Sequence, residues 1–139
     1  MKSAFIAVIL LAQTLRTFAA TEQVTPTELY YRWSFSAAGN SGSITISLKD
    51  GTLTRGTENK IETTAPSIEQ WRKFKEALNE LGVWNWKTRY GSDETGAGAS
   101  SSWQLVLKYP KRSLTSRGSL GAPKQFQQFV KALDGLFAK

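Results

Sequence analysis

Three stretches of the chain alternate between a mainly apolar and a mainly polar side, and this period of two constrains the fold more than any other feature. The stretches cover residues 29–37, 43–49 and 102–109; in the first, Trp33 falls on one side and Arg32 on the other. Side chains alternate across a strand, so each stretch predicts a β-strand with one buried face and one solvent face. Because all three strands have a polar face, we expect a sheet that is covered on one side only.

Turn signals place further strands around these three. Gly and Asn in residues 39–42 predict a hairpin, and Asp50-Gly51 predicts a tight turn into a weaker strand at residues 52–54. Residues 56–65 predict a loop, with an extended edge segment inside it as an open alternative. Residues 113–117 predict a polar strand at an edge of the sheet.

Two stretches have the three- and four-residue spacing of amphipathic helices. In residues 67–81, Ser67 and Gln70 predict a capping box, and Gly82 ends the pattern. Residues 123–137 carry a wide apolar stripe. The order βββ-α-ββ-α predicts an α+β two-layer sandwich, in which an antiparallel sheet of four or five strands is covered on one face by two helices. The expected core consists of Trp33, Phe35, Ile44, Ile46, Trp71, Phe74, Trp103, Leu105, Phe126, Phe129 and Leu133.

Residues 82–91 place three large aromatic residues between the first helix and the return of the sheet. Trp84 and Trp86 share the period of two of an extended segment, so we expect both on one side. Aromatic residues directly after a helix usually pack that helix onto its sheet, and we expect this of Trp84. For Trp86 and Tyr90 two alternatives stay open, a core position or an exposed platform for a sugar or a protein partner.

The first residues predict a secretory signal peptide. Lys2 precedes the uncharged apolar run of residues 4–12, and small residues follow it. This run is shorter than the roughly 20 apolar residues of a membrane-spanning helix. We expect cleavage after Ala19 or Ala20. The expected division of the chain is a signal peptide over residues 1–20, a flexible lead-in over 21–28 and a single α+β domain over 29–139.

The part that follows the signal peptide is basic and contains no cysteine. Removal of residues 1–20 takes two of the 18 basic side chains and none of the 11 acidic ones, which leaves a formal charge of +5. A domain of this size buries about two thirds of its unfolded surface, enough for a core without disulfides. Small secreted animal domains are usually rich in disulfides, so the composition favours a bacterial secreted or periplasmic protein, which we expect to be a monomer.

The chain contains no His and no Cys, which excludes Ser-His-Asp and Cys-His nucleophiles and the usual zinc ligand sets. We therefore expect no catalytic residue, no metal and no cofactor. Asp93 and Glu94 form the best acidic pair, but a glycosidase needs its carboxylates held rigidly across a sugar bond. Adjacent residues in a loop of Gly, Ala and Ser are poorly suited to this, so a carboxylate-dependent hydrolase is the least favoured function.

Alternation places four cationic residues on the polar face of the sheet: Arg32, Lys49, Lys108 and, if the last strand is in register, Arg117. They stand among Ser, Thr and Gln residues, and no acidic residue is predicted there. Such a face suits an anionic polymer, while a solvated face whose cations prevent aggregation of sheets explains the same pattern. Since we expect export, we do not expect nucleic acid as the physiological partner. The candidate binding residues are Arg32, Lys49, Lys108, Arg117, Trp86 and Tyr90.

A sparse pattern of aromatic and turn residues runs through the second half of the chain. It consists of Val83, Trp84, Trp86, Tyr90, Trp103, Ser116, Gly118, Pro123 and Phe126. The pattern resembles that of a group of small exported bacterial proteins of unassigned function, over roughly residues 33–136. In that group Asp-Gly commonly precedes the strand Trp, where this chain has Ser101-Ser102, and Asn often stands in place of Leu120. The resemblance implies no activity.

These observations favour a non-catalytic exported interaction domain that binds a protein or an anionic envelope polymer. The binding surface would be the polar face of the sheet or the loop over residues 90–101. The alternative is an inhibitor or immunity-type protein, whose aromatic turn and Gly-rich loop enter the cleft of an enzyme.

Overall fold

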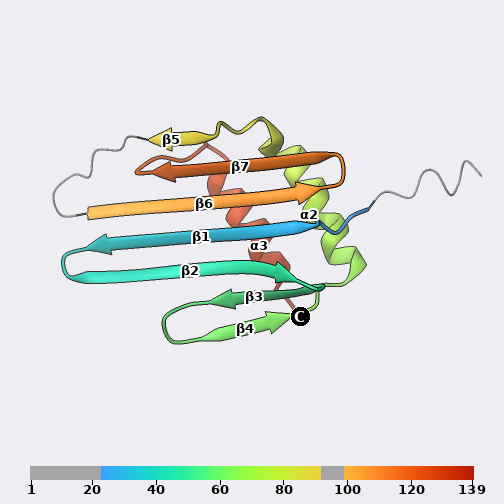
Figure 1. Ribbon diagram of the computed structural model, residues 1–139, viewed down its shortest axis with the longest axis horizontal. Coiled ribbons are helices and arrows are strands. Elements are labelled where there is room, and N and C mark those ends of the chain that lie inside the picture. Colours follow the sequence, from blue (N-terminus) through green and yellow to red (C-terminus); the bar gives the residue numbers. More distant parts are fainter. Residues whose placement is uncertain (1–22, 92–98) are drawn as a thin grey trace, which may run out of the picture.

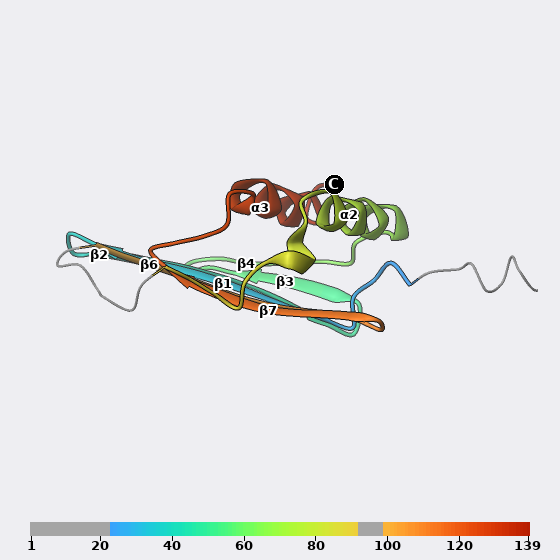
Figure 2. The same ribbon diagram turned by 90° about the horizontal axis from the view of Figure 1, so that it is seen from above.

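The computed structural model describes residues 23–91 and 99–139 of the chain. The strands in this part of the chain form one sheet (Figure 1). The strand order is β4-β3-β2-β1-β6-β7-β5, and neighbours are antiparallel except β5 and β7, which are parallel. Figure 2 shows that both helices lie on the same side of the sheet. The elements in chain order are β1 (Glu28–Ala37), β2 (Asn40–Lys49), β3 (Thr52–Gly56), β4 (Ile61–Thr64), α2 (Ile68–Glu80), the 3₁₀ helix η1 (Val83–Asn85), β5 (Arg89–Gly91), β6 (Ala99–Tyr109), β7 (Arg112–Ser119) and α3 (Phe126–Gly135).

The α+β class is confirmed, but the prediction of four or five antiparallel strands is wrong. The sheet is mixed and has seven strands in the described part of the chain. Strand β4 is the extended edge segment that residues 56–65 left open as an alternative to a loop. Strand β5 has three residues, and so short a segment shows too little alternation to be recognised in a sequence. Strand β5 pairs with β7 in parallel, which requires a long connection rather than a hairpin, and β6 lies within that connection.

Helix α2 forms with the predicted cap. Ser67 Oγ accepts a hydrogen bond from Gln70 N at 3.1 Å, and Gln70 Oε1 accepts one from Ser67 N at 2.9 Å. The apolar stripe of the helix starts at Ile68 in the sequence, but Ile68 is 67% exposed, so the buried stripe begins one turn later. The stripe consists of Trp71, Phe74 and Leu78.

Helix α3 supplies the centre of the core through Phe129 and Leu133, both fully buried. The ring of Phe129 lies 5.3 Å from that of Trp86. Gln70 at the start of α2 donates hydrogen bonds to the carbonyl oxygens of Gly135 and Ala138, at 3.2 and 2.9 Å. These bonds connect the beginning of one helix to the end of the other.

The aromatic residues after α2 do not form the extended segment that their spacing predicts. Gly82 adopts a left-handed conformation with φ 65°, and the chain then makes the single turn of η1. Both tryptophans nevertheless pack toward the core. Trp84 donates its indole hydrogen to Asn79 Oδ1 at 3.1 Å and packs edge-on against Tyr109, and Trp86 is 8% exposed.

One end of the sheet extends beyond the two helices (Figure 2). Trp33 and Ile44 are therefore half-buried and Phe35 is 37% exposed, although all three are predicted core residues. A strand of 10 residues such as β1 is about 33 Å long, and the helix layer does not reach its whole length. Phe126 is also half-buried. The predicted core residues that the structure confirms as buried are Ile46, Trp71, Phe74, Trp103, Leu105, Phe129 and Leu133.

Candidate functional site

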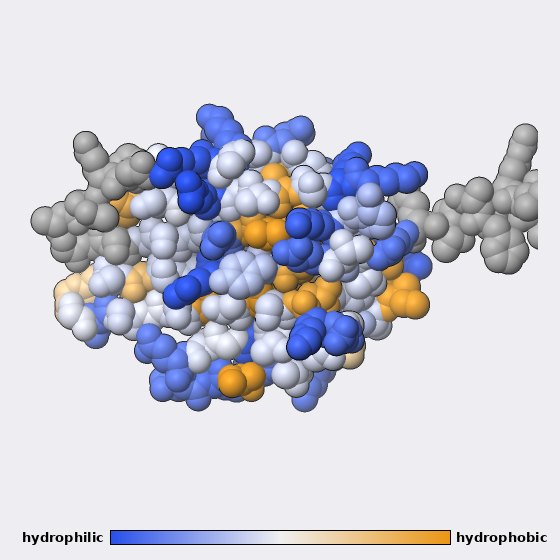
Figure 3. Space-filling model, viewed as in Figure 1, coloured by the Kyte–Doolittle hydropathy of each residue, from blue (hydrophilic) through white to orange (hydrophobic). Residues whose placement is uncertain are grey.

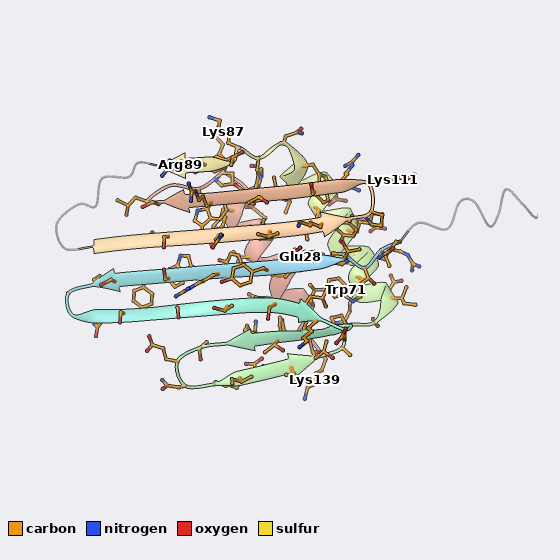
Figure 4. All side chains as sticks on the ribbon, viewed as in Figure 1. Glu28, Trp71, Lys87, Arg89, Lys111 and Lys139 are labelled. Carbon is orange, nitrogen blue, oxygen red and sulfur yellow. The ribbon has the colours of Figure 1, made fainter. Side chains whose placement is uncertain are left out.

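Three arginines and one glutamine stand in a line across four strands on the face of the sheet that the helices leave open. Arg32 of β1 is the Cα partner of Gln104 of β6, Gln104 is the partner of Arg117 of β7, and Arg117 is the partner of Arg89 of β5. We call these four residues the arginine row. Neighbouring strands are about 4.8 Å apart, so the backbone positions of Arg32 and Arg117 are roughly 10 Å apart. Figure 4 shows Arg89 at the β5 edge of the sheet.

The turn after α2 holds Arg89 beside Arg117. The amide nitrogen of Arg117 donates to the carbonyl oxygen of Thr88 at 3.0 Å, and Ser116 Oγ donates to the carbonyl oxygen of Lys87. The amide nitrogen of Lys87 donates to the hydroxyl oxygen of Tyr90 at 2.9 Å. The first two bonds join this turn to β7, and the third holds the turn against β5, so the position of Arg89 depends on this turn.

Close backbone approach at Gly91 completes the attachment of β5. Gly91 has φ 80°, and a Cβ atom at this position would collide with the backbone of Ser119. Only glycine combines this conformation with this contact. The end of β5 is thereby kept against the end of β7.

A second row, of serine hydroxyls, runs beside the arginine row. Ser34 of β1 is the Cα partner of Ser102 of β6, which is the partner of Ser119 of β7. We call these three residues the serine row. Each stands two residues along its strand from a member of the arginine row, a distance of about 7 Å. Ser34 Oγ and Ser102 Oγ lie 2.9 Å apart and share a hydrogen bond.

A depression of about 460 Å³ lies over the two rows. Figure 3 shows this face of the molecule, where hydrophilic side chains are spread across the strands with hydrophobic patches between them. Side chains of both rows line the depression, so it offers guanidinium, amide and hydroxyl groups together. The lining residues are Arg32, Ser34, Arg89, Tyr90, Ser102, Trp103, Gln104, Arg117, Gly118 and Ser119.

The arginine row carries a concentrated positive charge. Among the described strand residues whose register faces this side, Glu28 is the one carboxylate, which corrects the expectation of no acid there. Glu28 Oε2 pairs with Lys108 Nζ at 3.1 Å and stands four residues, about 13 Å, from Arg32 along β1. That distance exceeds the Debye length of about 8 Å at physiological salt, so Glu28 does not neutralise the row.

The structure brings together two of the four predicted cationic residues and places the other two away from them. Arg32 and Arg117 both belong to the arginine row and line the depression. Lys108 is paired with Glu28 nearer the end of the sheet. Lys49 is the partner of Thr52 at the end of β2 and does not line the depression.

Trp86 and Tyr90 face the helix side of the sheet. For Trp86 the structure selects the core position, because its ring lies 6.1 Å from that of Trp103 and the residue is 8% exposed. Tyr90 is half-buried, with its ring 6.0 Å from that of Trp103, and it also borders the depression. Neither residue forms an exposed aromatic platform on the open face.

Sequence reasoning missed Arg89 and Ser119. Arg89 belongs to a strand of three residues, and the one available signal was the polar-apolar step from Arg89 to Tyr90. Ser119 was missed because the predicted last strand ended at residue 117, two residues before the observed end of β7. Alternation did place Gln104 on the polar face.

The described residues hold no group of three or more potential metal ligands. Within residues 23–91 and 99–139, none of the helices has the length and apolar character needed to cross a membrane. Asp93 and Glu94, the acidic pair considered for hydrolysis, lie outside the described residues, as does the predicted signal peptide with its cleavage positions.

A comparison of the chain with protein-family models found no match, and a search of curated proteins found none either. The resemblance to small exported bacterial proteins therefore stays an expectation. The geometry and charge of the two rows are the features of the described residues that indicate a function.

Proposed function

We propose that this protein is a non-catalytic exported interaction domain that binds an anionic envelope polymer through the open face of its sheet. The observation that carries the proposal is the arginine row, in which Arg32, Arg117 and Arg89 line one depression. The exported location rests on the signal peptide predicted for residues 1–20.

Arginines placed side by side favour a ligand with several negative charges. Arg89 and Arg117 are cross-strand partners, and like charges directly opposite one another destabilise a sheet. Guanidinium groups form bidentate hydrogen bonds with carboxylate, sulfate and phosphate groups, so each arginine can bind one acidic group of a polymer.

The shape of the site suits an extended ligand. Both helices cover the opposite face, and none of the described elements crosses the open one (Figure 2). A chain can therefore enter and leave the depression on either side. A small molecule would be left largely exposed in such a site, whereas ligand pockets usually bury most of their ligand.

The test compares two double variants with the same change in charge. Arg32→Glu/Arg117→Glu changes the row, whereas Lys49→Glu/Lys111→Glu changes exposed lysines that do not line the depression. Fluorescence anisotropy measures the affinity for labelled polygalacturonate, polyglutamate and polyphosphate. We expect the row variant to lose at least about tenfold in affinity for a bound polyanion, because each charged hydrogen bond contributes about 1.5–3 kcal/mol.

The control variant should bind far better than the row variant, and wild-type affinity should fall as salt is raised. Equal affinity of the wild type and the row variant for every polyanion would contradict the proposal.

A protein partner is a second candidate, supported by the uncovered apolar end of the sheet. Phe35 is 37% exposed there and packs against Trp33, with ring centroids 5.1 Å apart. An inhibitor or immunity-type protein would use such a surface to bind an enzyme. Native extraction should then yield a stoichiometric complex with an enzyme that Phe35→Ser disrupts and Arg32→Glu/Arg117→Glu leaves intact.

A further inference from the structure

We propose that the polymer bound by the arginine row is an acidic glycan, whose acid groups lie over the arginines and whose hydroxyl groups lie over the serine row. This inference rests on the proposed function and names the ligand class for the same site. It depends on the alignment of the two rows and on the difference in their hydrogen-bonding chemistry.

The two rows run side by side across the same strands. On β1, β6 and β7 the arginine row contributes Arg32, Gln104 and Arg117, and the serine row stands two residues away on each strand. The rows are therefore parallel and about 7 Å apart along all three strands. A ligand that lies across the strands presents one edge to each row.

The two rows of the protein differ in the ligand groups that they can bind. Arginine side chains only donate hydrogen bonds, and they bind acidic groups. Serine hydroxyls and the Gln104 amide both donate and accept. The bond between Ser34 and Ser102 uses one hydroxyl hydrogen and one acceptor position, so the pair retains one hydrogen and further acceptor positions for a ligand.

Groups that accept as well as donate match a ligand that has hydroxyl groups of its own. A uronic acid residue carries a carboxylate and several hydroxyls on one ring, so its two edges can face the two rows together. Polyphosphate consists of acceptors alone, so it cannot donate to the serine oxygens. Polyglutamate donates and accepts through its backbone amides, but a flexible side chain separates each carboxylate from them, so the two kinds of group are not held together on one rigid ring.

The experiment uses three soluble polymers of matched length: polygalacturonate, polyglutamate and the neutral glycan dextran. The full protein is titrated against each labelled polymer by fluorescence anisotropy. The test variant is Ser34→Ala/Ser102→Ala, which removes both members of the hydroxyl pair and so leaves no partner unsatisfied. The matched control is Ser36→Ala/Ser113→Ala, which changes exposed serines of β1 and β7 that do not line the depression.

We expect wild-type protein to bind polygalacturonate more tightly than polyglutamate and to bind dextran weakly. Ser34→Ala/Ser102→Ala should reduce the affinity for polygalacturonate about tenfold, since two neutral hydrogen bonds are lost, and change that for polyglutamate less than about twofold. The control variant should match the wild type with both polymers. Thermal unfolding of each variant verifies that the fold is intact.

Two results separate this inference from the proposed function. If Ser34→Ala/Ser102→Ala weakens both polyanions equally, or neither, the assignment to an acidic glycan is overturned, while the loss of binding in Arg32→Glu/Arg117→Glu still supports an anion site. If the arginine variant binds all polyanions like the wild type, the proposed function itself is wrong.

Discussion

Arg89 and Arg117 are Cα partners in the parallel pair of β5 and β7, so two cationic residues from distant segments stand side by side on the open face of the sheet. The arrangement depends on the turn after α2, where Trp86 packs into the core and the carbonyl oxygen of Thr88 accepts a hydrogen bond from Arg117 N. Like charges directly opposite one another are unfavourable in a sheet, while two neighbouring guanidinium groups attract an anionic ligand. A binding site of this kind predicts that stability and binding respond in opposite directions to the loss of one charge.

Arg117→Gln should make the protein more stable while weakening the binding of polyanions. We expect the free energy of unfolding to rise by roughly 0.2–1 kcal/mol at low salt, because one of two opposed like charges is removed. The gain should disappear near 1 M salt, where the Debye length is about 3 Å. Urea denaturation measures the free energy of unfolding at both salt concentrations, and Lys111→Gln in the exposed turn is the control. A variant that is less stable than the wild type at both salt concentrations contradicts this account.

Gly118→Ala should destabilise the protein strongly. Gly118 is buried on β7, and a Cβ atom there would overlap both the carbonyl oxygen of Gly121 and the indole of Trp103. These two groups are joined by a hydrogen bond of 2.8 Å from the indole to that oxygen. Overpacking of a core costs about 1–3 kcal/mol, and the loss should appear in urea denaturation together with a change in tryptophan fluorescence. Gly135→Ala is the matched control. Nothing lies within 4 Å of a Cβ atom at that position, so it should gain about 0.4–1 kcal/mol. Wild-type stability of Gly118→Ala would show that the indole and the Gly121 backbone move at little cost.

Glu62→Gln should reduce stability at neutral pH but not at strongly acidic pH. Glu62 pairs with Arg55 at 2.8 Å and with Lys60 at 3.2 Å, and their hydrogen bonds lower the pKa of Glu62 from its ordinary value of 4.5. Because the pKa of Glu62 is lower in the folded state, its carboxylate stabilises the fold at pH values above the unfolded-state pKa. This stabilisation is lost as the pH falls through the pKa of the folded state. Thermal unfolding from pH 7 to about pH 2 should show the two proteins converging at the acidic end. The exposed carboxylate variant Glu58→Gln is the control. A difference in unfolding temperature between Glu62→Gln and the wild type that stays constant across this pH range argues against a stabilising charge on Glu62.

Tyr31→Phe should make the protein less sensitive to alkali. Burial, with a smaller contribution from Asp134, raises the pKa of Tyr31 from 10.0 to about 12. The folded state therefore retains the proton longer than the unfolded state, and this contribution to stability is lost as the pH rises from about 10 toward 12. Thermal unfolding across this range should show a smaller decrease for Tyr31→Phe than for the wild type. Tyr30→Phe, on the opposite face of β1, is the comparison, and identical pH profiles of Tyr31→Phe and wild type would refute the prediction.

Most of the central elements could be predicted because they are long enough to show a period. Ten or eleven residues in β1 and β6 leave no doubt about which side chains share a face, and the Ser67 capping box marks the start of α2. The errors occur where the pattern is short or its context is distant. Trp84 and Trp86 have the spacing of a strand, but Gly82 in a left-handed conformation starts a helical turn there. Phe35 has the character of a core residue, but no helix covers that end of the sheet (Figure 2).

The sequence by itself determined that Arg32, Gln104 and Arg117 face the same side of a sheet, because alternation assigns side chains to faces within each strand. It did not determine that they form one row, because alternation within a strand carries no information about register between strands. The tertiary structure decided the register, and it added Arg89 and Ser119 by placing β5 beside β7. The physical reason is that pairing between strands depends on the packing of the intervening segments, here the buried Trp86 and the glycine contact at Gly91, which no local pattern expresses.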